Sequence, residues 1–421
     1  MQEPVSPTSL RTAPSGLTGF EARVLASMDP GEAAALLQDL IHQRSDFPPG
    51  DTRAAIRVVA EKLAEVGIPV EVMARREQQA SLMAWLGDPS QSPLLMFHAH
   101  IDTVPAGDLQ RWLVDPFGGE VRDGIVYGRG AGDDKGSVAA QCMAFMALAR
   151  AGVNLNGCLQ LAVVADEESG GLEGTVWLRD LGKLKPDLLV VGEQTDNRVA
   201  VAERVACGID LTVFGKGTHG AMPWAGENAV LKTARALSWL QERLFPVLQA
   251  RSHPYLPPAT LNIGKIQGGI QWNIVPDWCK VEMDRRLLPG ETREAAMQEI
   301  QAVLDEFARS VEPLRYELFS QGEVAANVNT PYDHPFVTLA DQALADTAGE
   351  SRPLTGYVQT SDGRWFAGAD LPIIIFGPSD PAVAHAPDEH VSIVQLVEAA
   401  QFLALLALRQ LAVYPIPKEA I

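Results

Sequence analysis

Cysteine is scarce in this sequence of 421 residues, and the few cysteines that occur are scattered along it. No two of them form a C-x-x-C pair, which excludes a dense disulfide framework and a cysteine-based zinc site. We interpret them as reduced, mostly buried thiols of a cytoplasmic protein. They are Cys142, Cys158, Cys207 and Cys279.

Positive charge is also in short supply, because 34 Lys and Arg stand against 53 Asp and Glu, a net charge of −19. Nucleic acids and anionic membranes attract clustered positive charge, so we expect neither as a partner. No stretch is apolar enough to cross a membrane, and the strongest candidate, 391–413, is interrupted by polar residues and predicts an amphipathic terminal helix. Residues 1–19 lack the apolar segment of a signal peptide and predict a loose tail.

The order of apolar segments predicts two domains, as expected for a chain of this length. In 20–205 and again in 321–421, short apolar strands alternate with helices, which predicts an α/β domain around a mixed, mostly parallel sheet. In 206–320 the strands alternate between polar and apolar residues and follow the order β-α-β-β-α-β. This order predicts a ferredoxin-like α+β domain inserted into the first domain.

The glycine-rich stretch 128–136, with the sequence G-R-G-A-G-D-D-K-G, lies between a predicted strand and a predicted helix. Glycine lets the backbone approach a ligand or a metal closely, and here the turn presents Asp133 and Asp134. Alone, a tight turn whose Asp caps the helix is the simpler interpretation. Other acids and histidines at predicted strand ends favour a functional site instead.

These further residues each follow an apolar segment. With the alternation of a strand, His100 and Asp102 share one face, so Asp102 can orient a metal-bound His100 through its other ring nitrogen. The acids at 166–168 require a cation, a shared proton or solvent, because buried like charges repel. Taken one at a time, a hydrogen-bonded core histidine, a solvated loop or a helix cap would explain them. The set comprises His100, Asp102, Glu167, Glu168, Glu193 and His385.

Two histidines and three carboxylates are ligands that zinc, cobalt or manganese accept. If Asp133 bridges two metals and each metal takes one His and one Glu, three negative charges face four positive ones. A hydroxide between the metals would complete the balance and is the nucleophile of two-metal hydrolysis. We therefore expect two divalent ions per chain, zinc first, with cobalt or manganese as alternatives.

Five ordered motifs resemble those of the di-zinc aminoacylase and carboxypeptidase superfamily, and the match extends from about residue 32 to 412. The superfamily includes acetylornithine deacetylase, succinyl-diaminopimelate desuccinylase and the glutamate carboxypeptidases. The resemblance implies a zinc-hydrolase domain interrupted by a lid domain that forms a homodimer. The motifs are H-x-D-x-V-P, G-R-G-A-x-D-x-K-G, D-E-E-x-G, G-E-x-T and A-H-x-P-D-E.

Carried over by motif, the resemblance makes Glu167 the general base and Asp102 the partner of His100. It also implies a cis peptide bond between Asp133 and Asp134. The metal ligands follow in two pairs around a shared Asp133: His100 with Glu193, and Glu168 with His385.

In the lid, G-K-G-T-H resembles the motif whose histidine, here His219, reaches the active site of the partner subunit to stabilise the oxyanion. The stretch T-S-D-G-R is similar to the desuccinylase branch, but Met222 stands where that branch has a tyrosine, which puts a succinyl substrate in doubt. The proline-rich segment 253–258 also departs from the pattern. Positions matching those that handle substrate are Asn273, Arg286, Thr360 and Arg364.

These observations predict a homodimeric, cytoplasmic two-zinc hydrolase that cleaves an amide of a small carboxylate-bearing molecule. Arg286 or Arg364 is expected to bind that carboxylate through two parallel hydrogen bonds. A dipeptidase or carboxypeptidase is the alternative within the same chemistry, and the motifs do not separate the two. A non-catalytic binding protein would not need Glu167, and a serine hydrolase would need the G-x-S-x-G motif that is missing.

Overall fold

The computed structural model describes residues 16–322, 325–368 and 370–413. Its contacts divide the chain into two compact units. Unit 1 consists of Met1–Ala200, Thr330–Leu354 and Leu371–Ile421, and unit 2 of Val201–Asn329 and Thr355–Asp370. Unit 2 thus takes in 355–370 in addition to the region around the predicted insertion.

The predicted loose tail lies mostly outside the described residues, which begin at 16. Its last part differs from the prediction, because helix α1 (Gly19–Ala26) begins there. Thr18 and Glu21 cap this helix reciprocally, each side chain bonding the backbone of the other residue.

Unit 1 is built on a mixed sheet in which four adjacent strands run parallel. The parallel strands are β6 (Cys158–Val164), β3 (Leu94–His100), β7 (Leu188–Val191) and β16 (Ile373–Ile375). On the β6 side, β2 (Ala80–Gly87) and β1 (Val70–Ala74) extend the sheet with antiparallel pairing. On the β16 side, β8 (Ala200–Glu203) begins with an antiparallel pair between Ala200 and Ile375, and its later residues belong to unit 2 with β15 (Thr355–Tyr357). The predicted α/β class is confirmed.

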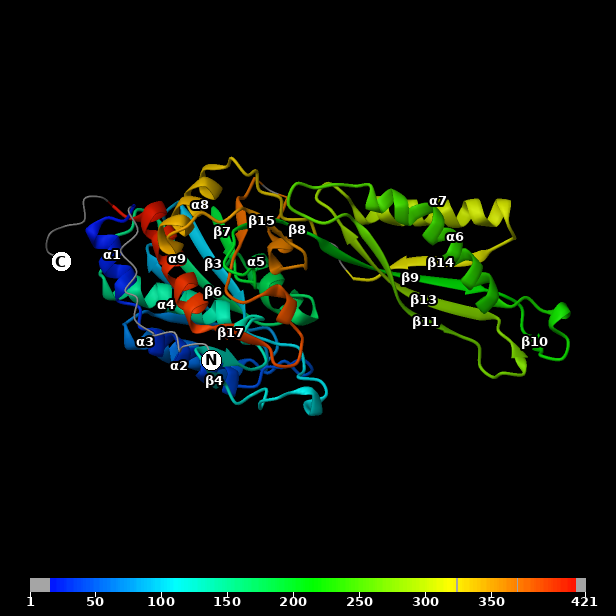
Figure 1. Ribbon diagram of the computed structural model, residues 1–421, viewed down its shortest axis with the longest axis horizontal. Helices are drawn as coiled ribbons and strands as arrows, with labels where there is room; N and C mark the ends of the chain where they lie inside the picture. Colours follow the sequence, from blue (N-terminus) through cyan, green and yellow to red (C-terminus); the bar gives the residue numbers. More distant parts are fainter. Residues whose placement is uncertain (1–15, 323–324, 369, 414–421) are drawn as a thin grey trace, which may run out of the picture. The chain divides into compact units, whose positions relative to one another are not determined.

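Helices cover the sheet because its central strands are apolar along their length, and every residue of β6 is buried. Helix α4 (Lys135–Arg150) packs against β3 and β6 and is buried at every position from Lys135 to Leu148. Such a helix belongs to the interior of the protein. Its first residues follow directly on the glycine-rich turn, so the turn is anchored to the core (Figure 1).

Contrary to the expectation that no stretch is apolar enough to cross a membrane, helix α9 (Ile393–Leu411) is long and apolar enough by length and composition alone. It packs instead against α4, α8 (Pro335–Ala348) and α2 (Pro30–His42), and 56% of its most apolar window is buried. Its Phe402 lies with its ring centroid 4.0 Å from that of Phe376. The apolar composition of α9 is therefore explained by the core of unit 1.

Unit 1 also contains further helical segments and a second, smaller sheet. Helix α3 (Arg53–Glu65) packs on β1 and β2, and a π-helical turn (Leu172–Val176) leads into α5 (Trp177–Asp180). A small separate sheet has the order β17 (His390–Ser392), β5 (Ile125–Tyr127) and β4 (Glu120–Arg122). Strands β4 and β5 form an antiparallel hairpin, and β17 pairs with the other side of β5.

Unit 2 contains an antiparallel sheet with the order β11-β13-β9-β14 and two helices packed against it (Figure 1). Along β9 every second residue is buried, so one face of the sheet receives the helices. The chain order confirms the predicted β-α-β-β-α-β pattern. The elements are β9 (Val205–Phe214), α6 (Ala229–Gln249), β11 (Thr260–Gly268), β13 (Trp278–Leu287), α7 (Arg293–Ser310) and β14 (Arg315–Ser320).

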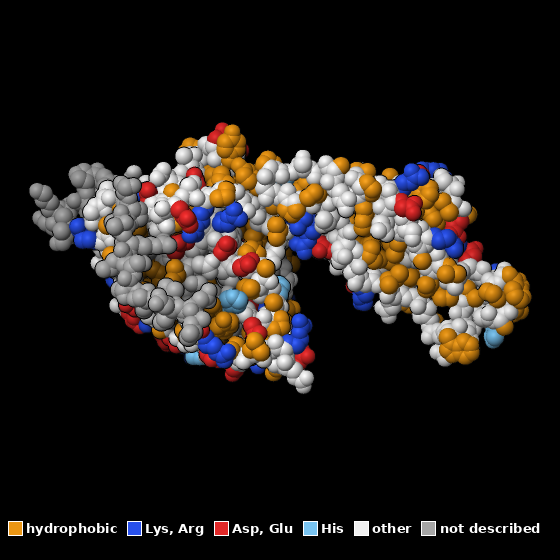
Figure 2. Space-filling model, viewed as in Figure 1, with side chains coloured by type: hydrophobic (Ala, Val, Ile, Leu, Met, Phe, Trp, Pro, Cys, Tyr) orange, Lys and Arg blue, Asp and Glu red, His pale blue; other side chains and the backbone are white. Residues whose placement is uncertain are grey.

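A two-stranded extension of unit 2 is formed by β10 (Thr218–His219) and β12 (Ile274–Val275). Around β10, hydrophobic side chains gather at the surface (Figure 2). Trp272 is 91% exposed, Trp224 80% and Ile270 76%. Exposed apolar groups of this size mark an interaction surface when they lie together.

Candidate metal centre

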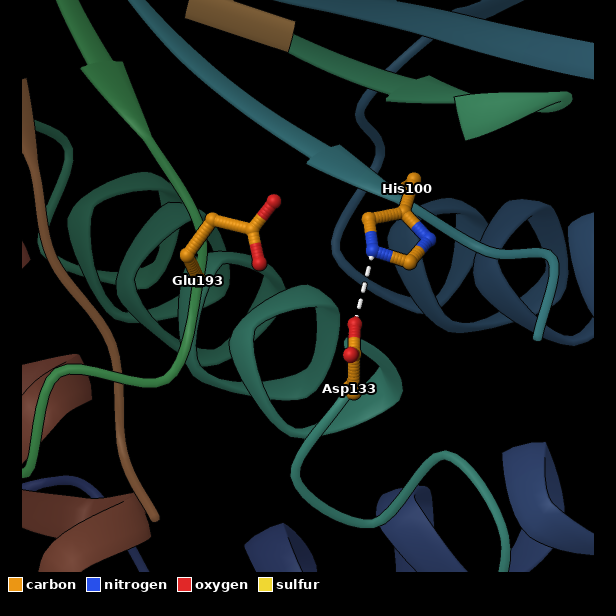
Figure 3. A group of neighbouring side chains, drawn as sticks. All are labelled: His100, Asp133 and Glu193. Atoms are coloured by element: carbon orange, nitrogen blue, oxygen red, sulfur yellow. Dashed lines mark hydrogen bonds and ion pairs between the residues drawn. The ribbon is translucent and has the colours of Figure 1, made fainter. Parts of the chain in front are cut away.

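The five predicted metal ligands come together in two sets that share Asp133. In each set the possible ligand atoms all lie within 4.8 Å of one another. Figure 3 shows the side chains of the first set pointing toward a common space. The first set is His100, Asp133 and Glu193, and the second is Asp133, Glu168 and His385.

Parallel strands explain how residues distant in the sequence meet. The strands β6, β3 and β7 are neighbours, so their carboxyl ends lie at one edge of the sheet. His100 is the last residue of β3, Glu168 follows β6, and Glu193 follows β7. Asp133 reaches the same edge from the glycine-rich turn, and His385 reaches it from the loop between β16 and β17.

His100 is held through both ring nitrogens. Its Nε2 lies 3.0 Å from Oδ1 of Asp133, and its Nδ1 lies 3.0 Å from the main-chain carbonyl oxygen of Asp102. We expected the carboxylate of Asp102 to contact Nδ1, but its Oδ1 lies farther away, at 3.7 Å. A main-chain carbonyl serves equally well to orient a ligating histidine.

The Asp102 carboxylate has a second task that the motif did not reveal. It accepts hydrogen bonds from the backbone N–H groups of Glu167, at 3.2 Å, and Glu168, at 3.1 Å. Asp102 therefore fixes the short turn that carries the predicted base and one predicted metal ligand. Asp166, just before this turn, accepts bonds from Gln79 and from the backbone of Glu173 and belongs to neither ligand set of the described residues.

The second set is more open than the first. Nε2 of His385 lies 3.1 Å from Oε1 of Glu168 and 3.2 Å from Oδ2 of Asp133. The His385 side chain is 49% exposed, whereas His100 and Glu193 are buried. A small molecule therefore has access to this set from solvent.

The charges of the site are unbalanced in favour of the acids. Burial raises the pKa of Glu193 well above its usual range, and the charge of Asp133 adds to the effect. Burial and Asp133 likewise raise the pKa of Glu168. Burial also opposes ionisation of Asp133, but hydrogen bonds with His100 and His385 hold its pKa below the usual range. The bonds with Asp133 and Glu168 raise the pKa of His385 to about 10.

Three carboxylates thus compete for the positive charge that two histidines can supply. Divalent cations relieve such crowding, and a set of two imidazoles and three carboxylates suits zinc, cobalt or manganese. The residues present therefore fit a pair of divalent ions bridged by Asp133.

The backbone and the neighbours of Asp133 fix its position at the site. One of these features was predicted from the sequence, and the others were not. The peptide bond between Asp133 and Asp134 is cis, as the resemblance implies. The Asp134 carboxylate accepts the backbone N–H of His100 at 3.3 Å. Nε2 of Gln194 donates to Oδ2 of Asp133 at 3.1 Å, a contact whose only sequence signal is that Gln194 follows Glu193.

Glu167, the predicted base, lies beside the candidate ligands without belonging to either set of the described residues. It begins a short 3-10 turn (Glu167–Ser169), next to Glu168. Its charge also contributes to the raised pKa of Glu193, after burial, Asp133 and Asp134.

The remaining predicted residues belong to unit 2, where His219 ends β10 and Asn273 immediately precedes the neighbouring strand β12. His219 is exposed, and its Nδ1 accepts the backbone N–H of Ala221 at 3.0 Å. The N–H of Gly220 donates to the carbonyl oxygen of Asn273 at 2.7 Å. Oδ1 of Asn273 is buried without a hydrogen-bond partner, so it is available to a donor on a ligand.

Arg286 and Thr360 are in direct contact. Nη1 of Arg286 donates to Oγ1 of Thr360 at 3.3 Å, and its Nε donates to Asp284 at 3.0 Å. Thr360 in turn donates to the carbonyl oxygen of Arg204 at 2.9 Å. The structure therefore joins two of the predicted substrate-handling residues and adds Arg204 to them.

Arg204 was not predicted, because no motif marks it. Its guanidinium donates to the carbonyl oxygens of Val358 and Pro258, the latter from the proline-rich segment. Burial and the nearby charge of Arg286 lower its pKa.

Arg364, by contrast, is engaged with its own loop. Its guanidinium lies 5.2 Å from the ring centroid of Trp365, and Nη2 lies 3.5 Å from Oδ1 of Asp362. The start of this loop is fixed by Glu203, which accepts the N–H of Ser361 at 2.9 Å and its hydroxyl at 2.7 Å. Burial raises the pKa of Glu203 to about 7.

Comparison with known proteins identifies the class of this fold and site. Residues 96–409 match the model of peptidase family M20/M25/M40, and the chain belongs to that family. It is 30% identical over 371 residues to a succinyl-diaminopimelate desuccinylase of Thioalkalivibrio sulfidiphilus, covering 86% of this chain and 94% of the relative.

Solved structures agree on the fold. A metallo-carboxypeptidase of this family from Sulfolobus solfataricus superposes with a TM-score of 0.74 at 17% identity, covering 89% of this chain and 98% of the other. The YXEP protein of Bacillus subtilis, described as a dinuclear metal-binding peptidase, gives a TM-score of 0.68 at 17% identity, covering 93% and 98%. The chain is thus a hydrolase of carbon–nitrogen bonds with the two-domain fold of this family.

The two ligand sets predict how metal binding responds to single substitutions. Wild-type protein should bind two divalent ions per chain, and Asp133→Asn should weaken both because Asp133 is shared. Glu193→Gln should weaken one ion, and His385→Gln the other. To check these stoichiometries, each protein is equilibrated with zinc and its metal content is measured by elemental mass spectrometry. A wild-type stoichiometry of one under excess zinc would refute the paired arrangement.

Proposed function

We propose that the protein hydrolyses the amide bond of a small N-acyl amino acid or a related carboxylate-bearing amide. The observation that carries the proposal is the pair of ligand sets joined by Asp133, with Glu167 beside them and outside both. The desuccinylase names of the relatives support an acyl amino acid substrate. A dipeptidase of the same chemistry is the second candidate, favoured by the dipeptidases among the structures of the same fold.

The residues of unit 1 would bind the metal ions, transfer the proton and hold the catalytic turn. Bound divalent ions, zinc in our proposal, would polarise the scissile carbonyl and make water more acidic. The carboxylate of Glu167 would accept the proton of the attacking water and return it to the leaving nitrogen. Asp102 would hold the turn of Glu167 and Glu168 by its two bonds to their backbone N–H groups.

Recognition of the substrate would fall to unit 2. Arg286 presents a guanidinium next to that of Arg204, which suits a carboxylate because bidentate bonds from arginine match its geometry. Asn273 contributes a buried acceptor, Oδ1, to a donor on the substrate. Thr360 and Arg364 lie on the adjoining loop and complete the proposed substrate-binding set.

The surface around β10 supports a homodimer. Trp224, Ile270 and Trp272 are far more exposed than tryptophan and isoleucine usually are, and such residues are enriched where subunits meet. We propose that a second copy covers this surface and that His219 then reaches the metal centre of that copy. The four buried free cysteines fit a reducing compartment, which we propose to be the cytoplasm.

The first test of this function is turnover of a panel of N-acyl amino acids and dipeptides by the zinc-loaded protein.

The role of Glu167 is tested by substitution. Glu167→Gln should lower kcat by roughly 10²-fold or more, the scale of a lost general base, with its metal content unchanged. Glu168→Gln is the matched comparison, because it should lose metal as well. Loss of metal in the Glu167 variant instead would make Glu167 a ligand.

The second test concerns His219 across the dimer. His219→Ala and Glu167→Ala should each be nearly inactive alone. Mixed dimers should recover activity, because one of their two sites pairs an intact Glu167 with an intact His219. Activity is measured after subunit exchange, with mixed dimers demonstrated by differently tagged copies. No recovery in proven mixed dimers would place His219 outside the site of the partner.

The third test concerns the substrate carboxylate. Amidation of that carboxylate should cost on the order of 2–4 kcal/mol in kcat/KM, the scale of breaking a buried charge pair. Arg286→Lys should lose much of the same amount on the acid and little on the amide. Arg235→Lys is the control, since Arg235 is an exposed residue of α6 paired with Glu312. Equal turnover of acid and amide by the wild type would exclude a carboxylate-binding arginine.

A further inference from the structure

Glu389 is a fully buried acid that belongs to neither ligand set of the described residues. It lies four residues after His385, immediately before β17. In the sequence it is only the last letter of A-H-x-P-D-E. Its position in the structure connects the loop of His385 with the glycine-rich turn that carries Asp133.

Four hydrogen bonds run from the glycine-rich turn to this one residue. Oε1 of Glu389 accepts the backbone N–H of Gly132 at 2.8 Å and of Asp133 at 2.9 Å. Its main-chain carbonyl accepts the N–H of Gly128 at 2.8 Å. The fourth bond is donated to Oε2 by Nη1 of Arg129.

The ion pair within this network is costly to bury. The Arg129 side chain is 2% exposed and that of Glu389 0%, and burial raises the pKa of Glu389 despite the neighbouring guanidinium. A buried ion pair is often no more stabilising than apolar residues of the same size. We therefore expect the ion pair to act mainly through the geometry that it imposes on the backbone of the turn.

The loop of His385 lies against the same turn. A Cβ atom on Gly132 would lie 2.7 Å from Oγ of Ser379, so only glycine allows this approach. The Ser379 hydroxyl donates to the carbonyl oxygen of His390 at 2.8 Å, and His390 pairs with Tyr127 in the small sheet. Both ends of the loop are therefore attached close to the turn, with Glu389 between His385 and this attachment.

We propose that Glu389 is a positioning residue that fixes Asp133 and His385 relative to one another, so that both ligand sets form together. Its Oε1 orients the peptide unit leading into Asp133, and Arg129 holds the carboxylate of Glu389 in the required orientation. The inference rests on the proposed two-metal function. It assigns Glu389 no contact with the metals or the substrate.

The test is metal affinity in the absence of catalysis. In Glu389→Gln, the amide oxygen can still accept the two backbone N–H groups, but the amide NH₂ then faces the donors of Arg129. We expect zinc to bind roughly 10–100-fold more weakly, as for other groups that orient metal ligands. Competition with a chromophoric chelator measures zinc affinity, and melting of the metal-free protein measures stability separately.

Three further variants make the result specific. Glu389→Asp keeps the charge but shortens the reach to Gly132 and Asp133, so it should also weaken zinc binding and decides the matter if Glu389→Gln does not fold. Adding Arg129→Met to Glu389→Gln removes the opposed donors and should restore part of the affinity. Asp346→Asn, which breaks the distant pair with Arg409, is the matched control and should lower stability alone.

Wild-type zinc affinity in a folded Glu389→Gln or Glu389→Asp variant would overturn the proposal, whatever happens to the melting temperature. The proposal would also be overturned if Asp346→Asn weakened zinc binding as much as the Glu389 variants do. Failure of the wild type to bind two ions would instead refute the two-metal function. The two failures are thus distinguishable by the wild-type titration alone.

Discussion

The crowding of carboxylates at one buried edge of the sheet is the constraint on which the rest of the structure depends. Asp133, Glu168 and Glu193 are gathered around a common space, and the imidazoles of His100 and His385 offset part of their charge. Such an arrangement is unfavourable by itself, because desolvation and like-charge repulsion both penalise the ionised acids. The fold must therefore hold these groups in place by other means and leave their charge to be neutralised by cations.

The parallel strands and the core helix α4 provide that support. Four of the five candidate ligands stand at the ends of β3, β6 and β7 or just before α4, and His385 stands on the loop between β16 and β17. The three strands and α4 are buried along most of their length. A rigid frame lets the ligands stay close although they repel. Metal binding to such a frame should stabilise the folded state in addition, since any ligand that binds only the native chain shifts the folding equilibrium.

The residues at the strand ends were predictable because parallel neighbours share an edge, so a histidine or an acid after each apolar segment must converge. Contacts that depend on the path of a loop were not predictable from the sequence. The carbonyl of Asp102 takes the place expected of its carboxylate, and His385 adopts a left-handed backbone conformation, with a φ of 60°. Glu389 bonds to the backbone of Asp133 across 256 residues, a separation over which sequence patterns carry no geometric information.

In the proposed function, activation of water and recognition of the substrate fall to different units of the protein. The candidate metal ligands and Glu167 lie on the frame of unit 1, whereas Arg204, Arg286, Asn273 and the loop that begins at Thr360 belong to unit 2. In the proposed function, activation of water falls to the first group, and His219 of a second copy assists, so relatives with different substrates can share this chemistry. Discrimination among substrates requires differential contacts, which unit 2 would supply. Since Met222 replaces a tyrosine of the desuccinylase branch beside His219, a difference from the succinyl substrate is expected to arise in unit 2.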